Sequence, residues 1–219
     1  MIKLNIALFG GRGASSLGTK GKDGMLKAYN KIKSEQLDVS YMSGYPVKLK
    51  SEFETFLDMK NNKVEYGYLI DKNGKVVAGA KGNKNSVGVA YSDNQEGMTL
   101  THNHPSKYGG TFSGADISYL TTAKLKQIRA VAKEGTYKMT ATKHANPVAF
   151  NKALAKDINK LNIKALKNQL KVKKGNLTKS QYKIHQRKAY VDTIDDWYKK
   201  NASKYGYEYT FKANKDFKI

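Results

Sequence analysis

Residues 64–80 read Val64-Glu65-Tyr66-Gly67-Tyr68-Leu69-Ile70-Asp71-Lys72-Asn73-Gly74-Lys75-Val76-Val77-Ala78-Gly79-Ala80. Two runs in this stretch, 64–70 and 76–80, are rich in the β-branched and aromatic side chains that are typical of strands. The segment between them contains Asn73-Gly74, a pair that can supply the two positive-φ positions of a type I′ turn. The stretch therefore predicts a β-hairpin with a type I′ turn.

Strands and helices are predicted on both sides of this hairpin. Alternation and short apolar runs predict strands over residues 1–9, 86–91, 97–102, 136–142 and 205–211. Helical periodicity predicts helices over residues 25–37, 51–60, 113–131, 151–170 and 180–200, and a Gly/Ser-rich linker is expected over 10–24. This mixture indicates an α/β protein of the α+β type.

The composition excludes several classes of protein. The 219 residues contain no Cys, which rules out disulfide scaffolds, Cys-type zinc fingers, iron–sulfur clusters and cysteine nucleophiles. No apolar run approaches the roughly 20 residues that span a bilayer, and the first nine residues lack a cleavage site. We expect a soluble, cytoplasmic protein without a membrane partner.

The chain is strongly basic, with 40 Lys+Arg against 18 Asp+Glu, a formal net charge of +22. The surplus is concentrated in residues 151–219, and nearly all of it is Lys. Lysine suits a solvated helix face that attracts anions, whereas base reading and bidentate phosphate binding favour Arg. We therefore expect a solvated surface that attracts anions. The partner it would suit is a protein substrate with an acidic face, and nucleic acid is the alternative.

A metal-binding pattern follows in the second third of the chain. Thr101-His102-Asn103-His104-Pro105 is followed by Ser113 and Asp116, which gives His-x-His-Pro-x7-Ser-x2-Asp. Imidazoles at positions i and i+2 of an extended segment project to the same side, so both can reach one ion. Asp116, in the first turn of the next helix, can supply a third ligand. Two His and one carboxylate with an open fourth position are typical of catalytic zinc, Zn²⁺.

Hydrolysis at such a site also needs a proton carrier. Glu65 is the candidate, because a strand core is an unusual place for a carboxylate and Gly67 leaves room beside it. Glu96 is the second candidate, although it falls in a predicted turn. His144 and His185 are expected to lie at the surface without a ligand role.

The pattern resembles the JAMM/MPN (JAB-type) zinc metallopeptidases, whose signature is a Glu on an early strand followed by the same spacing. The resemblance implies a curved mixed sheet flanked by helices, similar to the cytidine deaminase fold, and hydrolysis of a peptide or isopeptide bond. It implies Glu65 as general acid/base, and His102, His104 and Asp116 as zinc ligands. It implies that Ser113 forms a hydrogen bond with the water or with the tetrahedral oxyanion. The resemblance covers a catalytic core at 51–142. Beside it, the sequence predicts an N-terminal segment at 1–50, with a strand, a Gly/Ser-rich linker and a helix, and a basic helical extension at 143–219 that ends in a strand.

Two departures from the family pattern keep alternatives open. Asn103 between the histidines resembles the bacterial RadC branch, and the basic helices have no counterpart in the minimal domain. The alternatives are a RadC-like protein associated with nucleic acid and a non-catalytic MPN scaffold. The Gly-rich stretch at 10–18 is similar to linkers in phage head-associated proteins, and a phage-encoded chain would act in the host cytoplasm.

Overall fold

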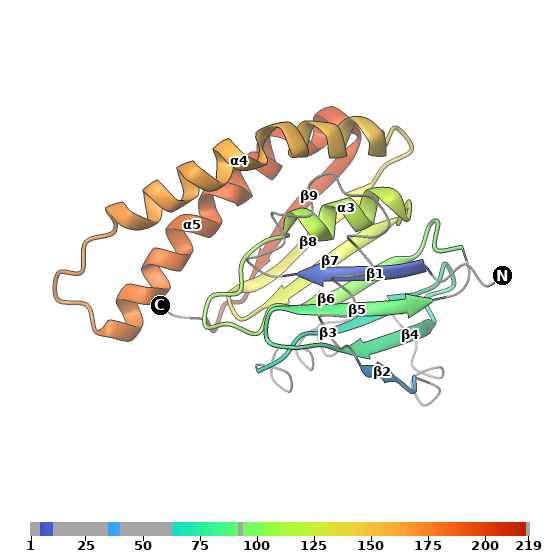
Figure 1. Ribbon diagram of the computed structural model, residues 1–219, viewed down its shortest axis with the longest axis horizontal. Helices are drawn as coiled ribbons and strands as arrows, with labels where there is room; N and C mark the ends of the chain where they lie inside the picture. Colours follow the sequence, from blue (N-terminus) through green and yellow to red (C-terminus); the bar gives the residue numbers. More distant parts are fainter. Residues whose placement is uncertain (1–4, 11–34, 40–62, 92–93, 218–219) are drawn as a thin grey trace.

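The computed structural model describes residues 5–10, 35–39, 63–91 and 94–217 of the chain (Figure 1). Its strands are β1 (Asn5–Gly10), β2 (Glu35–Leu37), β3 (Tyr66–Ile70), β4 (Val76–Lys81), β5 (Ser86–Tyr91), β6 (Thr99–Asn103), β7 (Gln127–Ala132), β8 (Gly135–Ala141) and β9 (Tyr207–Ala213). Its helices are α3 (Gly114–Thr122), α4 (Pro147–Lys171) and α5 (Lys179–Asn201), followed by a 3₁₀ turn, η3 (Ala202–Tyr205).

Seven strands form one open mixed sheet in the order β2-β4-β3-β6-β7-β8-β9. The pair β6–β7 is parallel and every other pair in this sheet is antiparallel. A parallel pair needs a crossover, and α3 provides it between β6 and β7. Strands β1 and β5 form a separate antiparallel ladder. The α+β class predicted from the sequence is confirmed.

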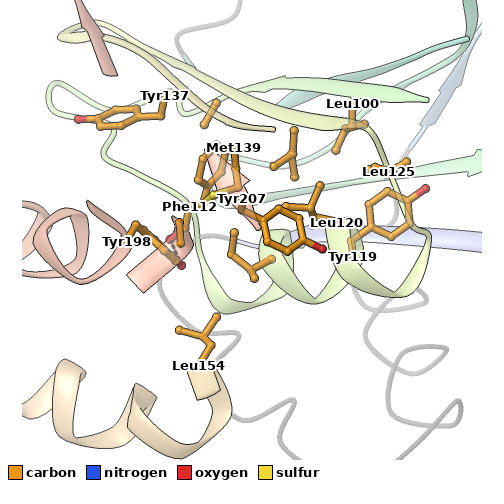
Figure 2. Packing of buried hydrophobic residues seen from close by; sticks show 14 of the residues in the cluster. Leu100, Phe112, Tyr119, Leu120, Leu125, Tyr137, Met139, Leu154, Tyr198 and Tyr207 are labelled. Atoms are coloured by element: carbon orange, nitrogen blue, oxygen red, sulfur yellow. Dashed lines mark hydrogen bonds between the residues drawn. The ribbon is translucent and has the colours of Figure 1, made fainter. Parts of the chain in front are cut away.

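The main core lies between the sheet and α3. Ile117 and Leu120 of α3 pack with Leu100 of β6, Ile128 of β7 and Met139 of β8, all of them fully buried. Figure 2 shows Leu120, Leu100 and Met139 in this cluster, with Phe112 and Tyr207 beside them. The parallel strands β6 and β7 thus lie buried beneath a helix, as parallel strands usually do.

The C-terminal elements share this core. Strand β9 pairs with β8 from Tyr207↔Ala141 to Ala213↔Gly135, and α4 and α5 lie side by side as an antiparallel hairpin (Figure 1). Phe150 and Leu154 of α4 and Tyr198 of α5 belong to the same hydrophobic cluster as Leu120. The cluster therefore includes residues on both sides of position 142, and the division of the chain at that point remains a prediction.

Helices α4 and α5 confirm the predicted basic helical region. Six lysines of α4 are exposed, namely Lys152, Lys156, Lys160, Lys164, Lys167 and Lys171. The helix begins at Pro147 behind Asn146, whose side chain accepts from the amide of Ala149 at 3.0 Å. In the described part of the chain, no helix has the length and apolar character needed to cross a membrane.

The predicted helix over 113–131 is wrong in its second half. Helix α3 ends at Thr122, Lys124 takes a positive φ of 49°, and the chain then enters β7. Ile128 and Ala130 are buried in the sheet beside β6. Because the segment is apolar and short, its periodicity fits a strand as well as a helix, and pairing with β6 decides the outcome.

Two further predictions are corrected, and two lie outside the described residues. Residues 35–37, the end of the helix predicted over 25–37, form strand β2 against β4.

The turn between β3 and β4 has a positive φ at Gly74 and not at Asn73, so it is not type I′. Instead, Asp71 accepts from the amides of Asn73 and Lys75 at 2.9 and 2.8 Å, which stabilises a turn whose last residue, Gly74, is left-handed. The linker at 11–24 and the helix at 51–60 lie outside the described residues.

A pair of leucines in α4 tests whether the C-terminal helices belong to the core. Leu154 is 3% exposed and Leu170 is 77% exposed. Leu154→Ala should lower the free energy of unfolding by about 2–5 kcal/mol, because it leaves a cavity in the shared core. Leu170→Ala should change it by less than about 0.5 kcal/mol. Urea unfolding followed by circular dichroism measures both, and equal small effects would mean that α4 does not stabilise the core.

Candidate metal centre

The residues of the His-x-His motif lie where β6 ends. His102 is the fourth residue of β6, and the amide of His104 donates to the carbonyl of Val131 at 2.8 Å, which continues the β6–β7 pairing. The two imidazoles face each other, with 3.1 Å between their Nε2 atoms. The i, i+2 spacing has therefore brought both rings to one side of the chain, as predicted.

Helix α3 brings Asp116 to the same place. Ser113 is the N-cap of α3, and its Oγ accepts from the amide of Asp116 at 3.2 Å. Asp116 returns the bond, because its Oδ2 accepts from the amide of Ser113 at 2.6 Å. This reciprocal capping box fixes the carboxylate and leaves Oδ1 directed at Nε2 of His102, at 3.2 Å. The Ser-x2-Asp part of the motif is thus a helix cap that positions a ligand.

These three side chains could hold a metal ion. One ligand atom from each of His102, His104 and Asp116 lies within 4.8 Å of the others. Tetrahedral ligands about 2.1 Å from a zinc ion would be about 3.4 Å apart, close to the 3.1 and 3.2 Å separations above. The nitrogen and oxygen donors suit zinc and other divalent transition metals. The predicted ligand set fits a metal ion. Within the described ranges it offers three donors, so a four-coordinate ion bound by these donors alone would keep one position for water or substrate.

The protonation states also suit a metal. Burial, with a smaller contribution from His102, lowers the pKa of His104 to about 4, so its ring is neutral near pH 7. Burial alone would raise the pKa of Asp116, but His102 and His104 bring the pKa below its usual range. A neutral imidazole and an ionised carboxylate are the forms that coordinate metals.

The ring of His104 is oriented by the loop that follows it. Its Nδ1 lies 2.8 Å from the carbonyl oxygen of Gly110, and because a carbonyl can only accept, Nδ1 carries the proton. Its Nε2 then presents a lone pair toward His102 and Asp116. A backbone carbonyl in this position is typical of histidine ligands of metals.

A buried carboxylate and an arginine hold this loop in turn. The carboxylate of Glu134, in the β7–β8 turn, accepts from the amides of Gly109 and Gly110 at 3.0 and 2.6 Å. From α5, Nη2 of Arg187 donates to the carbonyl of Gly109 at 3.0 Å. Gly110 has a φ of +95°, and a Cβ there would lie 2.6 Å from Val191 of α5, so only glycine fits. Nothing in the His-x-His-Pro-x7-Ser-x2-Asp motif indicates Glu134, which follows the motif in the sequence.

Asn103, between the two histidines, positions the strand that carries Glu65. Its side chain accepts from the amide of Tyr66 at 2.6 Å and donates to the carbonyl of Val64 at 3.1 Å. Both bonds flank Glu65, and Asn103 is itself 1% exposed. Asn103, where the motif departs from the family pattern, therefore joins the segment that carries Glu65 to strand β6, which carries His102.

Glu65 lies just before β3, with its side chain 3% exposed. Burial, and to a lesser degree the charge of Asp116, raise the pKa of Glu65 well above its ordinary value. Glu96 differs in every respect, since it is exposed and pairs with Lys124 at 3.7 Å in the turn that precedes β6, at the opposite end from His104. Of the two candidate carboxyl groups, Glu65 lines the cavity beside the cluster and Glu96 does not.

A cavity of about 580 Å³ opens onto the cluster. His104, Glu65 and Ser113 line it, whereas the fully buried His102 and Asp116 lie behind them. Two loops also contribute to the lining, with Lys84 and Asn85 from the one before β5 and Ser106, Gly109 and Thr111 from the one before α3. The opposite wall comes from α4 and α5, through residues Ile158, Asn162, Arg187, Tyr190, Val191, Ile194 and Tyr198.

The metal-binding motif gives no sign of this helical wall, and the sequence indicates α4 and α5 only as a basic extension. The available signal is the i, i+4 spacing of Tyr190 and Ile194, which places both on one side of a helix. The remaining histidines take no part in the cluster: His144 is exposed and His185 is half-buried on α5.

The fold and the site together define an α+β protein with a buried His–His–Asp cluster that could hold a metal ion. No family model, curated protein or solved structure matches this chain. The geometry of the site therefore carries the functional argument.

Metal content tests the ligand set directly. The purified chain should bind about one zinc per molecule, and His104→Ala should lower that content at least tenfold because it removes one of three ligands. The exposed His144→Ala is the matched control and should keep the wild-type content. Mass spectrometry of dialysed protein measures this, and full zinc in His104→Ala would contradict the assignment.

The buried carboxyl of Glu65 should make the metal-free protein sensitive to pH. Its pKa is higher in the folded than in the unfolded chain, so its contribution to stability is present below the ordinary pKa and is lost as pH rises. Glu65→Gln removes that loss, so the variant should gain stability relative to wild type between pH 5 and pH 8. Urea unfolding in the presence of EDTA measures the difference. A difference that does not change with pH would contradict the burial of an ionisable group here.

Proposed function

We propose that the chain is a zinc-dependent metallopeptidase or isopeptidase that hydrolyses an amide bond in a protein. One observation supports the proposal: the His–His–Asp cluster and the buried Glu65 lie at the same cavity, which His104 and Glu65 both line. A zinc ion at the cluster would lower the pKa of a bound water to about 7 and polarise the substrate carbonyl. The choice of an amide over other hydrolysable bonds comes from the resemblance to the JAMM/MPN family.

Glu65 suits the role of general base and then general acid. A carboxyl whose pKa is raised by burial holds a proton more strongly than an exposed one, so it can accept a proton from water and pass it to a leaving amine. Asn103 holds the backbone on both sides of Glu65, so the carboxyl is positioned before a substrate arrives.

Ser113 suits the stabilisation of the oxyanion. Its Oγ accepts from the amide of Asp116, and a serine hydroxyl carries one further O–H donor. Because Ser113 lines the cavity, that donor can reach a substrate carbonyl oxygen as negative charge develops.

A second candidate is a RadC-like protein that associates with nucleic acid. The observation that favours it is the run of residues 158–191, which contains ten basic residues and no acidic one. The run is almost all lysine, which favours attraction of an acidic protein face over base recognition. A non-catalytic scaffold ranks below both, because every ligand of the motif and the buried Glu65 are present.

The test compares wild type with Glu65→Gln in a cell extract. Wild type should produce new protein termini, detected by mass spectrometry, and Glu65→Gln should reduce their yield by about 10²–10⁴-fold while keeping zinc. The exposed Glu96→Gln is the matched control and should keep full activity. Zinc-dependent processing of nucleic acid, without any Glu65-dependent protein cleavage, would favour the RadC-like alternative.

A further inference from the structure

A second groove lies next to the metal cavity, and those of its lining residues that the structure describes are all basic or neutral. It has a volume of about 570 Å³ and lies between the loop at 106–108 and the first half of α5. Its described lining residues are Ser106, Lys107, Tyr108, Lys179, Ser180, Lys183, Ile184 and Arg187. Four of these are cations and none is acidic, so the groove attracts negative charge.

The groove adjoins the metal cavity. Ser106 and Arg187 line both hollows, so a ligand bound in the groove lies next to the cavity. Lys179, Lys183 and Arg187 are spaced at i, i+4 and i+8 on α5, which places them along one side of the helix over about 12 Å. An extended peptide covers that distance with about four residues.

The groove is built rather than a chance gathering of surface lysines. Nζ of Lys107 donates to Oγ of Ser180 at 2.7 Å, which links its two walls. Arg187 is held by its bond to Gly109 and by the ring of Tyr190, 5.1 Å from its guanidinium carbon. On α5 the acidic residues begin only at Asp192, which does not line the groove and forms an ion pair with Lys188.

The geometry points to a substrate with an acidic tract of about four residues next to the scissile bond, bound in this groove. The choice of a peptide rests on the proposed function. Lysine predominates in the groove, and its one aromatic ring, Tyr108, is 7% exposed and offers little surface for stacking bases. An acidic peptide therefore fits better than a single-stranded nucleic acid.

The test measures binding separately from hydrolysis. The probe is a fluorescein-labelled peptide with four consecutive Glu, and its partner carries four Gln instead. Fluorescence anisotropy is recorded with the full-length Glu65→Gln chain, so that the probe is not consumed. The Glu peptide should bind at least about tenfold more tightly, and added salt should reduce the difference.

Two double variants with the same change in charge and the same spacing locate the site. Lys179→Glu/Lys183→Glu should weaken binding of the Glu peptide by about tenfold or more, because it reverses charge in the groove. Lys160→Glu/Lys164→Glu, on the exposed side of α4, should have a much smaller effect. Both should keep the zinc content of the parent chain, which shows that they fold. If both double variants weakened binding of the Glu peptide equally, the peptide would be held by the overall positive charge of the chain, and the groove would not be its site.

The remaining outcomes separate this inference from the proposed function. Groove-dependent binding of the Glu peptide, together with no Glu65-dependent protein cleavage in the cell extract, would support the groove and refute the peptidase. Equal binding and equal cleavage of the two peptides would refute the groove and leave the peptidase standing. A single-stranded DNA oligonucleotide that binds more tightly than the Glu peptide, and depends on the same lysines, would overturn the acidic tract in favour of nucleic acid.

Discussion

The carboxylate of Asp116 links helix α3 to the end of strand β6, and the site depends on that link. One oxygen accepts from the amide of Ser113 and completes the helix cap, while the other lies 3.2 Å from His102. A buried carboxylate without such partners would cost several kcal/mol. Because one side chain serves both the fold and the cluster, the position of α3 on the sheet sets the geometry of the candidate ligands.

The loop between His104 and α3 connects the cluster to the β7–β8 turn and to α5. Its backbone is held by Glu134 from the β7–β8 turn, by Arg187 from α5 and by Tyr198, whose hydroxyl donates to the carbonyl of Phe112 at 3.2 Å. Helices α4 and α5 are therefore part of the site itself. They form one wall of the cavity and support the loop that orients His104.

Much of the fold could be predicted from the sequence, because local patterns and final structure agree there. The hairpin of β3 and β4, the strands β5, β6, β8 and β9, and the helices α4 and α5 all follow from periodicity and capping. Strand β7 could not be predicted, since its apolar residues fit a helix until pairing with β6 is known. The turn at Gly74 was mistaken in type because Asp71 bonds the amides that follow it.

The candidate site was predictable to the extent that its residues lie in one short motif. His102, His104, Ser113 and Asp116 are brought together by a strand end and a helix start that are close in sequence. Glu134, Arg187 and the wall of α4 and α5 could not be predicted in the same way, because they reach the site through tertiary packing. Asn103 was noticed only as a departure from a family pattern, whereas its hydrogen bonds give it a positioning role.

Anomalous X-ray scattering at the zinc edge, from crystals of the purified chain, tests the central claim most directly. We expect one strong anomalous peak about 2.0–2.2 Å from Nε2 of His102, Nε2 of His104 and Oδ1 of Asp116. The fourth coordination position should face Glu65 and the cavity. A peak bound through other residues, or a fourth ligand from a protein side chain that closes the site, would contradict it.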